Sequence, residues 1–302
     1  MPDRGGVDMD GGLAATWLDL IPGLVAAVQL ELDPGAGMAS MWLDLDPGVG
    51  AAAAVAGLLG LLLGSFLNVC ALRWSEDRSV ITPRSSCPGC GTPIAWYDNI
   101  PVLSWLILRG RCRSCGSGIS VQYPLVELTT GVIWAAMVLT WGVEVEALRG
   151  ALFLTLLLGI AVADARFYII PDQFSVGGAV IGFLLAFASP EITWLESLVG
   201  AAAGLFLLWF VAWAGEKAFR KEAMGGGDIK MMAMVGAFLG VWGMLLTLFM
   251  GALLGAVIFG PISWKTGKLV PFGIFLALGA AFTWIWGDAL VAWYMEWAFP
   301  TY

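Results

Sequence analysis

Four of the five cysteines lie in one polar stretch, spaced as two pairs that could hold a metal ion. Cys87 and Cys90 form the first CxxC pair, and Cys112 and Cys115 form the second, with 21 residues between the pairs. Two such pairs complete a closed tetrahedral site of the structural zinc type. Disulfides or free thiols are the alternative. The spacing favours zinc, which would fold a loop with too little core of its own. Cys70 lies in an apolar stretch and is interpreted as a small buried hydrophobe.

Two aspartates sit at the edges of apolar stretches, where a charge is costly. Asp164 lies in AVADARFYIIPD, and Asp228 follows three glycines in MGGGDIK. A carboxylate at membrane depth marks a functional site by default, and the glycines permit the close approach of another helix or a substrate backbone. Two carboxyl groups within reach of each other share one proton. We therefore interpret Asp164 and Asp228 as the catalytic pair of an aspartic peptidase.

Structural roles for the same residues are the alternative at this point. Asp164 could pair with Arg166 or Lys230 at the membrane boundary, and Asp228 could cap the N-terminus of a helix. Asp172, which follows a proline, is interpreted as an N-cap.

Composition decides where these residues must work. Of the 302 residues 59% are hydrophobic and only 13% charged, and the mean hydropathy is +0.85. Soluble domains carry about 25% charged residues, so the chain belongs in a bilayer. It contains no histidine, which excludes Ser-His-Asp and Cys-His catalysis. The net charge is −8, which gives no basic surface for nucleic acid.

The apolar stretches predict an all-α polytopic membrane protein with about eight transmembrane helices, since a bilayer span needs about 20 apolar residues. Residues 231–264 are uncharged over a length too great for one span, and the GVWG sequence at 240–243 predicts a turn that divides them. The other predicted spans are 51–72, 123–141, 148–167, 173–189, 197–215 and 269–286. Glu127, near the start of the second span, is interpreted as a structural partner for an arginine, with a catalytic or substrate-binding role as the alternative.

Basic residues orient these spans. If the N-terminus is external and every span crosses, thirteen of the fifteen Lys and Arg residues fall on one side, and only Arg4 and Arg149 fall on the other. Lys and Arg accumulate on the cytoplasmic side of membrane proteins. The cysteine loop and both aspartates are therefore expected to face the cytoplasm, where disulfides are rare.

Charge and hydropathy divide the chain into four parts. Residues 1–50 hold eight acidic residues against one base, and the apolar stretch 14–30 within them is interrupted by Asp19 and Pro22. The predicted parts are an acidic, extracytoplasmic N-terminal extension (1–50), a first transmembrane helix (51–72), a cytoplasmic four-cysteine zinc loop (73–122) and a transmembrane aspartic peptidase domain (123–302).

Several motifs, in this order, are similar to those of the bacterial type IV prepilin peptidases, the bifunctional leader peptidase/N-methyltransferases. They extend from about Gly64 to about Phe272 and are GSFLNV (64–69), the two CxxC pairs, YPLVEL (123–128), the segment from Asp164 to Asp172 that ends in IPD, GGGDIK (225–230) and PFG (271–273).

This resemblance implies what the chain acts on. Its substrates would be prepilins or pseudopilins with a short basic leader, cleaved after a glycine at the cytoplasmic face of the bacterial inner membrane. Asp164 and Asp228 match the catalytic pair of the family. The resemblance also implies methylation of the new N-terminal amine with S-adenosylmethionine. The residues that bind this methyl donor are unknown, because the chain has no glycine-rich dinucleotide fingerprint.

Two other classes of function compete with this one. A proton- or ion-coupled carrier would need ionisable groups near the middle of the bilayer and repeated halves, whereas here the acids cluster at one face and no repeat follows residue 50. A zinc-knuckle membrane scaffold without catalysis would make both aspartates dispensable.

Overall fold

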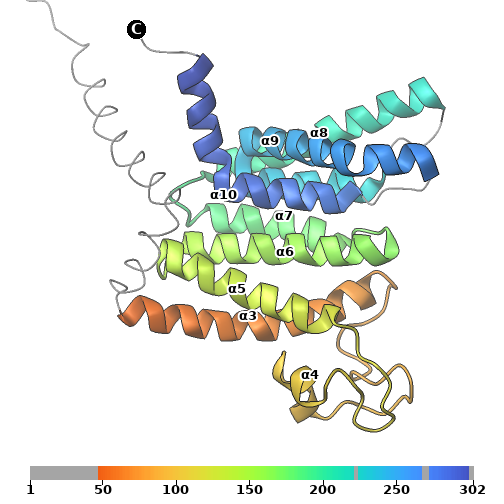
Figure 1. Cartoon of the computed structure of the whole chain (residues 1–302). Helices are drawn as coiled ribbons and strands as arrows, with labels where there is room; N and C mark the ends of the chain where they lie inside the picture. The colour runs from red at the N-terminus through yellow and green to blue at the C-terminus, as the bar shows by residue number, and fades with distance from the viewer. Residues whose placement is uncertain (1–46, 221–223, 267–271, 299–302) are drawn as a thin grey trace, which may run out of the picture. The chain divides into compact units, whose positions relative to one another are not determined.

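The computed structural model describes residues 47–220, 224–266 and 272–298, which are helical apart from connecting loops and two isolated β-bridges. The chain divides into two units, Met1–Gly50 and Ala51–Tyr302. Most of the acidic extension predicted for residues 1–50 lies outside the described residues. The helices in Figure 1 are α3 (Pro47–Trp74), the 3-10 helix η1 (Trp96–Asn99), α4 (Leu103–Ile107), α5 (Gln122–Trp141), α6 (Val145–Phe167), α7 (Asp172–Ala186), α8 (Trp194–Phe219), α9 (Gly226–Thr266) and α10 (Phe272–Ala298).

Six of the described helices are long and apolar enough to cross a membrane: α3, α5, α6, α8, α9 and α10. This confirms the predicted all-α polytopic membrane protein. The turn predicted at residues 240–243 is also present, because Gly240 breaks α9 with a φ of 66° and a ψ of −171°. The apolar segments thus number eight when α7 and both parts of α9 are counted. Of these, α7 and the first part of α9, residues 226–239, are shorter than a bilayer span.

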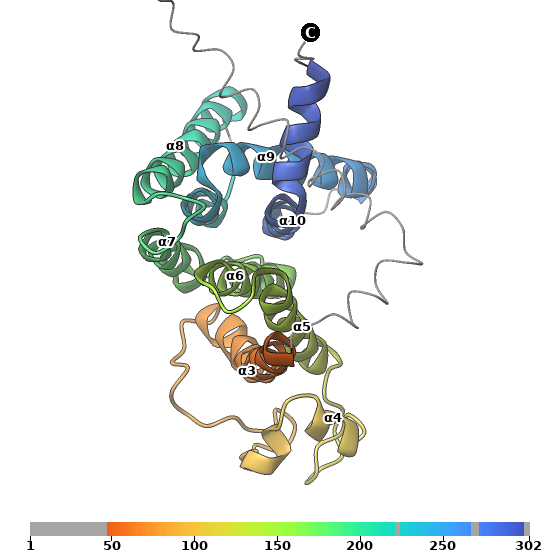
Figure 2. The same cartoon turned by 90° about the vertical axis from the view of Figure 1, so that its left-hand side faces the viewer.

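The core of the second unit lies around the first part of α9. Figures 1 and 2 show α3, α5, α6 and α7 side by side in chain order, and α9 packs against α7, α8 and α10. Glycines let α8 and α9 touch through their backbones. A Cβ atom at Gly236 would lie only 2.0 Å from the carbonyl oxygen of Gly200, and one at Gly204 only 2.2 Å from that of Met232. Small residues four apart are the usual means of close helix packing in membranes.

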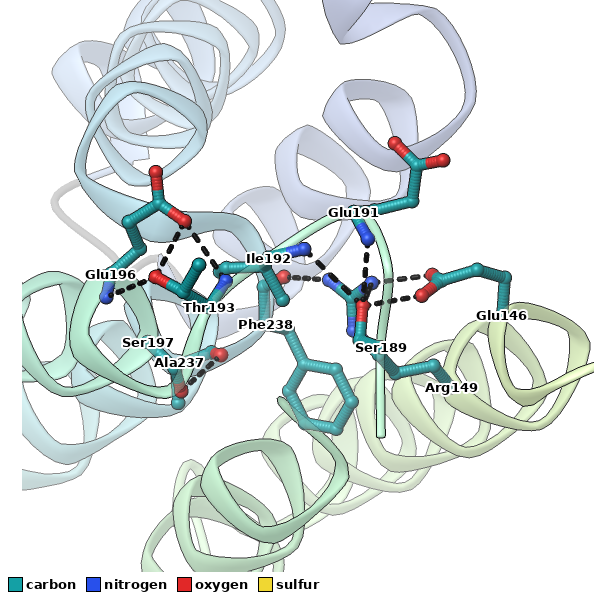
Figure 3. A network of polar contacts seen from close by, with 10 residues as sticks. All are labelled: Glu146, Arg149, Ser189, Glu191, Ile192, Thr193, Glu196, Ser197, Ala237 and Phe238. Atoms are coloured by element: carbon teal, nitrogen blue, oxygen red, sulfur yellow. Dashed lines mark hydrogen bonds and ion pairs between the residues drawn. The ribbon is translucent and has the colours of Figure 1, made fainter. Parts of the chain in front are cut away.

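A buried charged cluster holds the end of the first part of α9, as Figure 3 shows. Arg149 is 4% exposed, and its guanidinium forms an ion pair with Glu146 and donates to the carbonyl of Phe238. The hydroxyl of Ser197 donates to the carbonyl of Ala237 at 2.7 Å. Helix ends leave such carbonyls without intrahelical partners, so the cluster caps α9 at its break. The span predicted at 148–167 places Arg149 at its external end, whereas the structure encloses this side chain between helices.

Candidate catalytic and metal sites

The four loop cysteines converge on one point. Their Sγ atoms all lie within 4.8 Å of one another, and the Sγ atoms of Cys87 and Cys115 are 3.8 Å apart. Each CxxC pair sits in a tight turn, in which Gly91 N–H donates to the Cys87 carbonyl at 2.8 Å and Gly116 N–H to the Cys112 carbonyl at 2.9 Å. Both glycines have positive φ, 70° and 73°. The cluster could hold a metal ion.

Hydroxyl groups beside the thiols favour their ionised form. The Ser117 hydroxyl contacts the Sγ atoms of Cys87 and Cys115 at 3.4 and 3.1 Å. This contact, together with backbone N–H groups, lowers the pKa of Cys87 to about 6 and also lowers the pKa of Cys115. In the first turn, the Cys90 thiol donates to the Thr92 hydroxyl oxygen at 3.3 Å. Sequence reasoning missed both hydroxyls, although the repeated pattern Cys-x-x-Cys-Gly-Ser/Thr could have indicated them.

Asp164 lies in the last turn of α6, where its carboxyl group meets the start of α10. The side chain is buried, and its Oδ2 atom accepts a hydrogen bond from the Ile274 N–H at 3.1 Å. N–H groups in the first turn of a helix are free to bind anions. A Cβ atom at Gly273 would lie 2.9 Å from the same Oδ2, so a larger residue there would displace the carboxyl group. Among the described residues no base forms an ion pair with Asp164, and neither Arg166 nor Lys230 contacts it.

Asp228 lies in the first turn of α9 and is half-buried. It is the third residue of that helix and therefore not its N-cap. The Asp164 and Asp228 carboxyl groups are near enough to interact electrostatically. Ile170, in the loop between α6 and α7, helps to bring them together, because positions 227 and 273 both touch its side chain: a Cβ atom at either glycine would lie 2.9 Å from it.

Asp172 and Lys230 form an exposed ion pair beside this site. The Lys230 ammonium contacts both carboxylate oxygens of Asp172, at 2.7 and 2.8 Å, and so joins the start of α7 to the start of α9. The interpretation of Asp172 as an N-cap is wrong. Pro171 occupies the N-cap position of α7, and Asp172 is the first helical residue.

Glu127 connects the loop to the membrane helices. It is 7% exposed, and its Oε2 atom accepts a hydrogen bond from the Val102 N–H at 2.7 Å. The Ser65 hydroxyl is a second hydrogen-bond partner. The prediction that Glu127 is structural agrees with these contacts, but the predicted arginine partner is wrong, because within the described residues the carboxylate binds a backbone amide and a hydroxyl instead.

These features define a class: multi-pass helical membrane proteins that carry a four-thiol loop and two neighbouring carboxyl groups where α6, α9 and α10 meet. Residues 58–141 match the family model described as Bacterial Peptidase A24 N-terminal domain, and residues 151–260 match that of the Type IV leader peptidase family. The chain belongs to the type IV leader peptidase family. This confirms the resemblance drawn from its motifs and argues against the carrier and the scaffold.

Three relatives, each named prepilin leader peptidase/N-methyltransferase, illustrate the match. That of Myxococcus xanthus is 42% identical over 214 residues, which are 71% of this chain and 64% of that protein. The Bacillus subtilis relative is 36% identical, and the match covers 80% of this chain and 97% of that protein. The Aeromonas hydrophila relative is 35% identical, and the match covers 79% of this chain and 92% of that protein. The match therefore spans less than two thirds of the Myxococcus protein but nearly all of the other two. No solved structure matches the chain.

Proposed function

We propose that this chain is an aspartic endopeptidase of the membrane that removes the basic leader from prepilins or pseudopilins and then methylates the new N-terminal amine. One observation carries the peptidase: Asp164 and Asp228, 64 residues apart in sequence, interact at the meeting point of α6, α9 and α10. The names of its relatives support both the cleavage and the methylation.

The mechanism follows from two carboxyl groups that share one proton. The ionised group takes a proton from a water molecule, whose oxygen bonds to the scissile carbonyl carbon, while the protonated group donates to the carbonyl oxygen. Collapse of the tetrahedral intermediate breaks the C–N bond and returns a proton to the departing amine. The hydrogen bond from Ile274 to Asp164 keeps that carboxyl group oriented. A Cβ atom at Gly226 would meet nothing within 4 Å, so the start of α9 leaves space in which an extended peptide backbone can approach.

Asparagine variants test the pair. In Asp164→Asn or Asp228→Asn, leader cleavage should fall at least about 100-fold, because general acid–base catalysis is lost. Methyl transfer to a peptide that has already been cleaved should persist. The measurement is the mass of a prepilin peptide after incubation with the purified protein and labelled methyl donor. Glu216→Gln, which neutralises an exposed acid near the end of α8, is the matched control. Cleavage near the wild-type rate by either asparagine variant would contradict the assignment.

We infer that Cys87, Cys90, Cys112 and Cys115 hold a structural zinc ion. Tetrahedral zinc–sulfur bonds of about 2.3 Å place sulfur atoms about 3.8 Å apart, which agrees with the separation of Cys87 and Cys115. With all four positions filled by thiolates, the ion would supply folding energy to the loop and take no part in the chemistry.

S-adenosylmethionine is proposed as the methyl donor on family grounds alone. A small cavity among α3, α5 and α6, lined in part by Asn68, Tyr123 and Arg166, has a volume of about 10 Å³. That is room for about one water molecule and too little for an adenosine group. We therefore assign no residue to the donor.

We also propose that the loop and both carboxyl groups face the cytoplasm from the bacterial inner membrane. The distribution of basic residues supports this orientation, since thirteen of fifteen fall on that side.

A further inference from the structure

Six apolar side chains on one segment of the cysteine loop are largely exposed in the part of the chain that the structure describes. We call them the α4 edge. Each is at least 40% exposed, and Ile107 and Trp96 reach 66% and 76%. Apolar groups collected in this way usually mark a contact surface. The α4 edge consists of Trp96, Tyr97, Ile100, Leu103, Leu106 and Ile107.

The position of this edge relative to the membrane helices is set by Glu127. The Val102 N–H, immediately before α4, donates to Glu127, which is the sixth residue of α5. At 1.5 Å per residue, that point lies about 8 Å inside the helix. Figures 1 and 2 both show α4 beside the bundle rather than beyond the ends of its helices. The α4 edge therefore lies at the depth of the second turn of a membrane-spanning helix.

The part of α5 around Glu127 carries exposed apolar side chains, as expected of a surface that faces lipid. Leu125 and Leu128, on either side of Glu127 in sequence, are 56% and 51% exposed on a helix apolar enough to span the bilayer. Leu103, the first residue of α4, directly follows the Val102 whose N–H donates to Glu127, so the α4 edge is tied to this part of α5. Its composition, with Trp96 and Tyr97 next to aliphatic side chains, is typical of the boundary between headgroups and acyl chains.

Charge supports a lipid surface as the occupant. The loop from residue 73 to residue 122 carries six arginines against three acidic residues, although the whole chain is acidic. Arg109 and Arg111 directly follow α4, are exposed, and form no ion pair with any residue that the structure describes. Guanidinium groups bind phosphate through paired hydrogen bonds.

We propose that the α4 edge inserts into the lipid leaflet next to the loop, with Arg109 and Arg111 bound to anionic phospholipid headgroups. The loop is then fastened at two places, to α5 through Glu127 and to the bilayer through the edge. A second copy of this chain, or the apolar helix of a substrate, would be a different occupant of the same surface.

Photolabelling separates these occupants. The full-length protein is reconstituted in vesicles of phosphatidylethanolamine and phosphatidylglycerol that contain a phospholipid with a diazirine on its acyl chain, and labelled residues are mapped by mass. We expect label within residues 96–107 as well as on Leu125 and Leu128, and none within residues 84–92. Label on α5 without label on 96–107 would overturn the proposal, as would crosslinks from 96–107 to a second copy instead of to lipid.

Variants make the test specific. Leu106→Glu combined with Ile107→Glu should lower labelling of residues 96–107 by about tenfold, because charged side chains are excluded from the acyl region. Ile81→Glu is the matched control. Ile81 is 83% exposed, but its segment is bound to Arg73, in the last turn of α3, through the carbonyls of Ser79 and Pro83. The labelling pattern of Ile81→Glu should match that of the wild type. If Ile81→Glu lowered the labelling of residues 96–107 as much as the double glutamate variant does, the proposal would be contradicted.

A second pair of substitutions tests the headgroup contacts without touching the apolar side chains. Arg109→Gln combined with Arg111→Gln should remove the increase in labelling that phosphatidylglycerol produces over neutral vesicles. Retention of four-sulfur metal binding shows that the loop is folded in each variant. If the double glutamate variant loses metal, the proposal is judged from the labelling of the wild type and of the double glutamine variant. In the glutamine variant, an unchanged increase in labelling with phosphatidylglycerol would contradict the arginine contacts.

Discussion

At the scale of single residues, Ser117 is expected to affect how firmly the thiol cluster would hold the proposed zinc ion. Its hydroxyl contacts two of the four sulfurs and lowers their pKa values. Protons compete with metal for thiolates, so a lower pKa preserves binding to a lower pH. In Ser117→Ala these pKa values should rise, and metal should be released at a higher pH during acid titration, as measured by a chromogenic chelator. Ser114→Ala, in the same turn, should leave the release midpoint unchanged. Equal midpoints for Ser117→Ala and the wild type would contradict the role given to this hydroxyl.

Residue type and spacing predicted the groups that could do chemistry but not the groups that hold them. Cysteine pairs and membrane-edge aspartates are rare enough to be recognised in the sequence. The donors to Asp164 and Glu127 are the backbone N–H groups of Ile274 and Val102. Every residue except proline has such a donor, so no side-chain pattern identifies it. The contact of Ile170 with two glycines is equally invisible, because it depends on three helix ends meeting.

At the scale of elements, the break in α9 depends on the buried Arg149. This side chain pairs with Glu146, caps the Phe238 carbonyl and lies 5.1 Å from the ring centre of Trp284. Arg149→Met would leave the Glu146 charge buried and unpaired, which typically costs about 3–5 kcal/mol. A clear drop in thermal unfolding temperature in detergent is expected.

Two further variants show whether the loss of stability in Arg149→Met comes from the unpaired charge. Adding Glu146→Gln to Arg149→Met should recover part of the stability, because the uncompensated charge is removed. Arg113→Met, which breaks the exposed ion pair with Asp98, should change stability by less than about 1 kcal/mol. An Arg149→Met variant as stable as the wild type would show that the cluster does not support the break.

The close contact between α8 and α9 leads to a second prediction about stability. In Gly236→Ala the added methyl group would overlap the Gly200 carbonyl, so the two helices must separate. The expected destabilisation is about 1–3 kcal/mol, measured by thermal unfolding. Gly177→Ala, on α7, adds the same methyl group where nothing lies within 4 Å. It should be neutral or stabilising because alanine favours the helix, and equal effects of the two substitutions would refute the packing argument.

The positions of the helices were easier to predict from the sequence than the contacts between them. Apolar length alone located the spans, and a glycine-rich tetrapeptide located the break. Sequence periodicity could not show that α6 begins at Val145, before the apolar stretch at 148–167 that was used to place the span. Arg149 was therefore placed at the external end of the predicted span, while the fold encloses it.

At the scale of the whole molecule, orientation can be tested with two reporter cysteines. Val143, between α5 and α6, is 79% exposed, and Ile81, in the cysteine loop, is 83% exposed. If the loop faces the cytoplasm, an impermeant maleimide should label Val143→Cys in intact spheroplasts and Ile81→Cys only after permeabilisation. The wild-type chain gives the background from its own thiols. The opposite pattern would invert the proposed orientation and place the carboxyl pair outside the cell.

The shortness of α7 has a consequence for the surrounding bilayer. Its 15 residues are about 23 Å long, and Val180 and Leu184 on its outer face are 53% and 61% exposed. The hydrocarbon layer of a bilayer is about 30 Å thick, which exceeds the length of α7. A bilayer responds to such a hydrophobic mismatch by becoming thinner locally. This local thinning would bring the lipid headgroups closer to the start of α7. Hydrolytic water would then have a shorter path through fatty acyl chains.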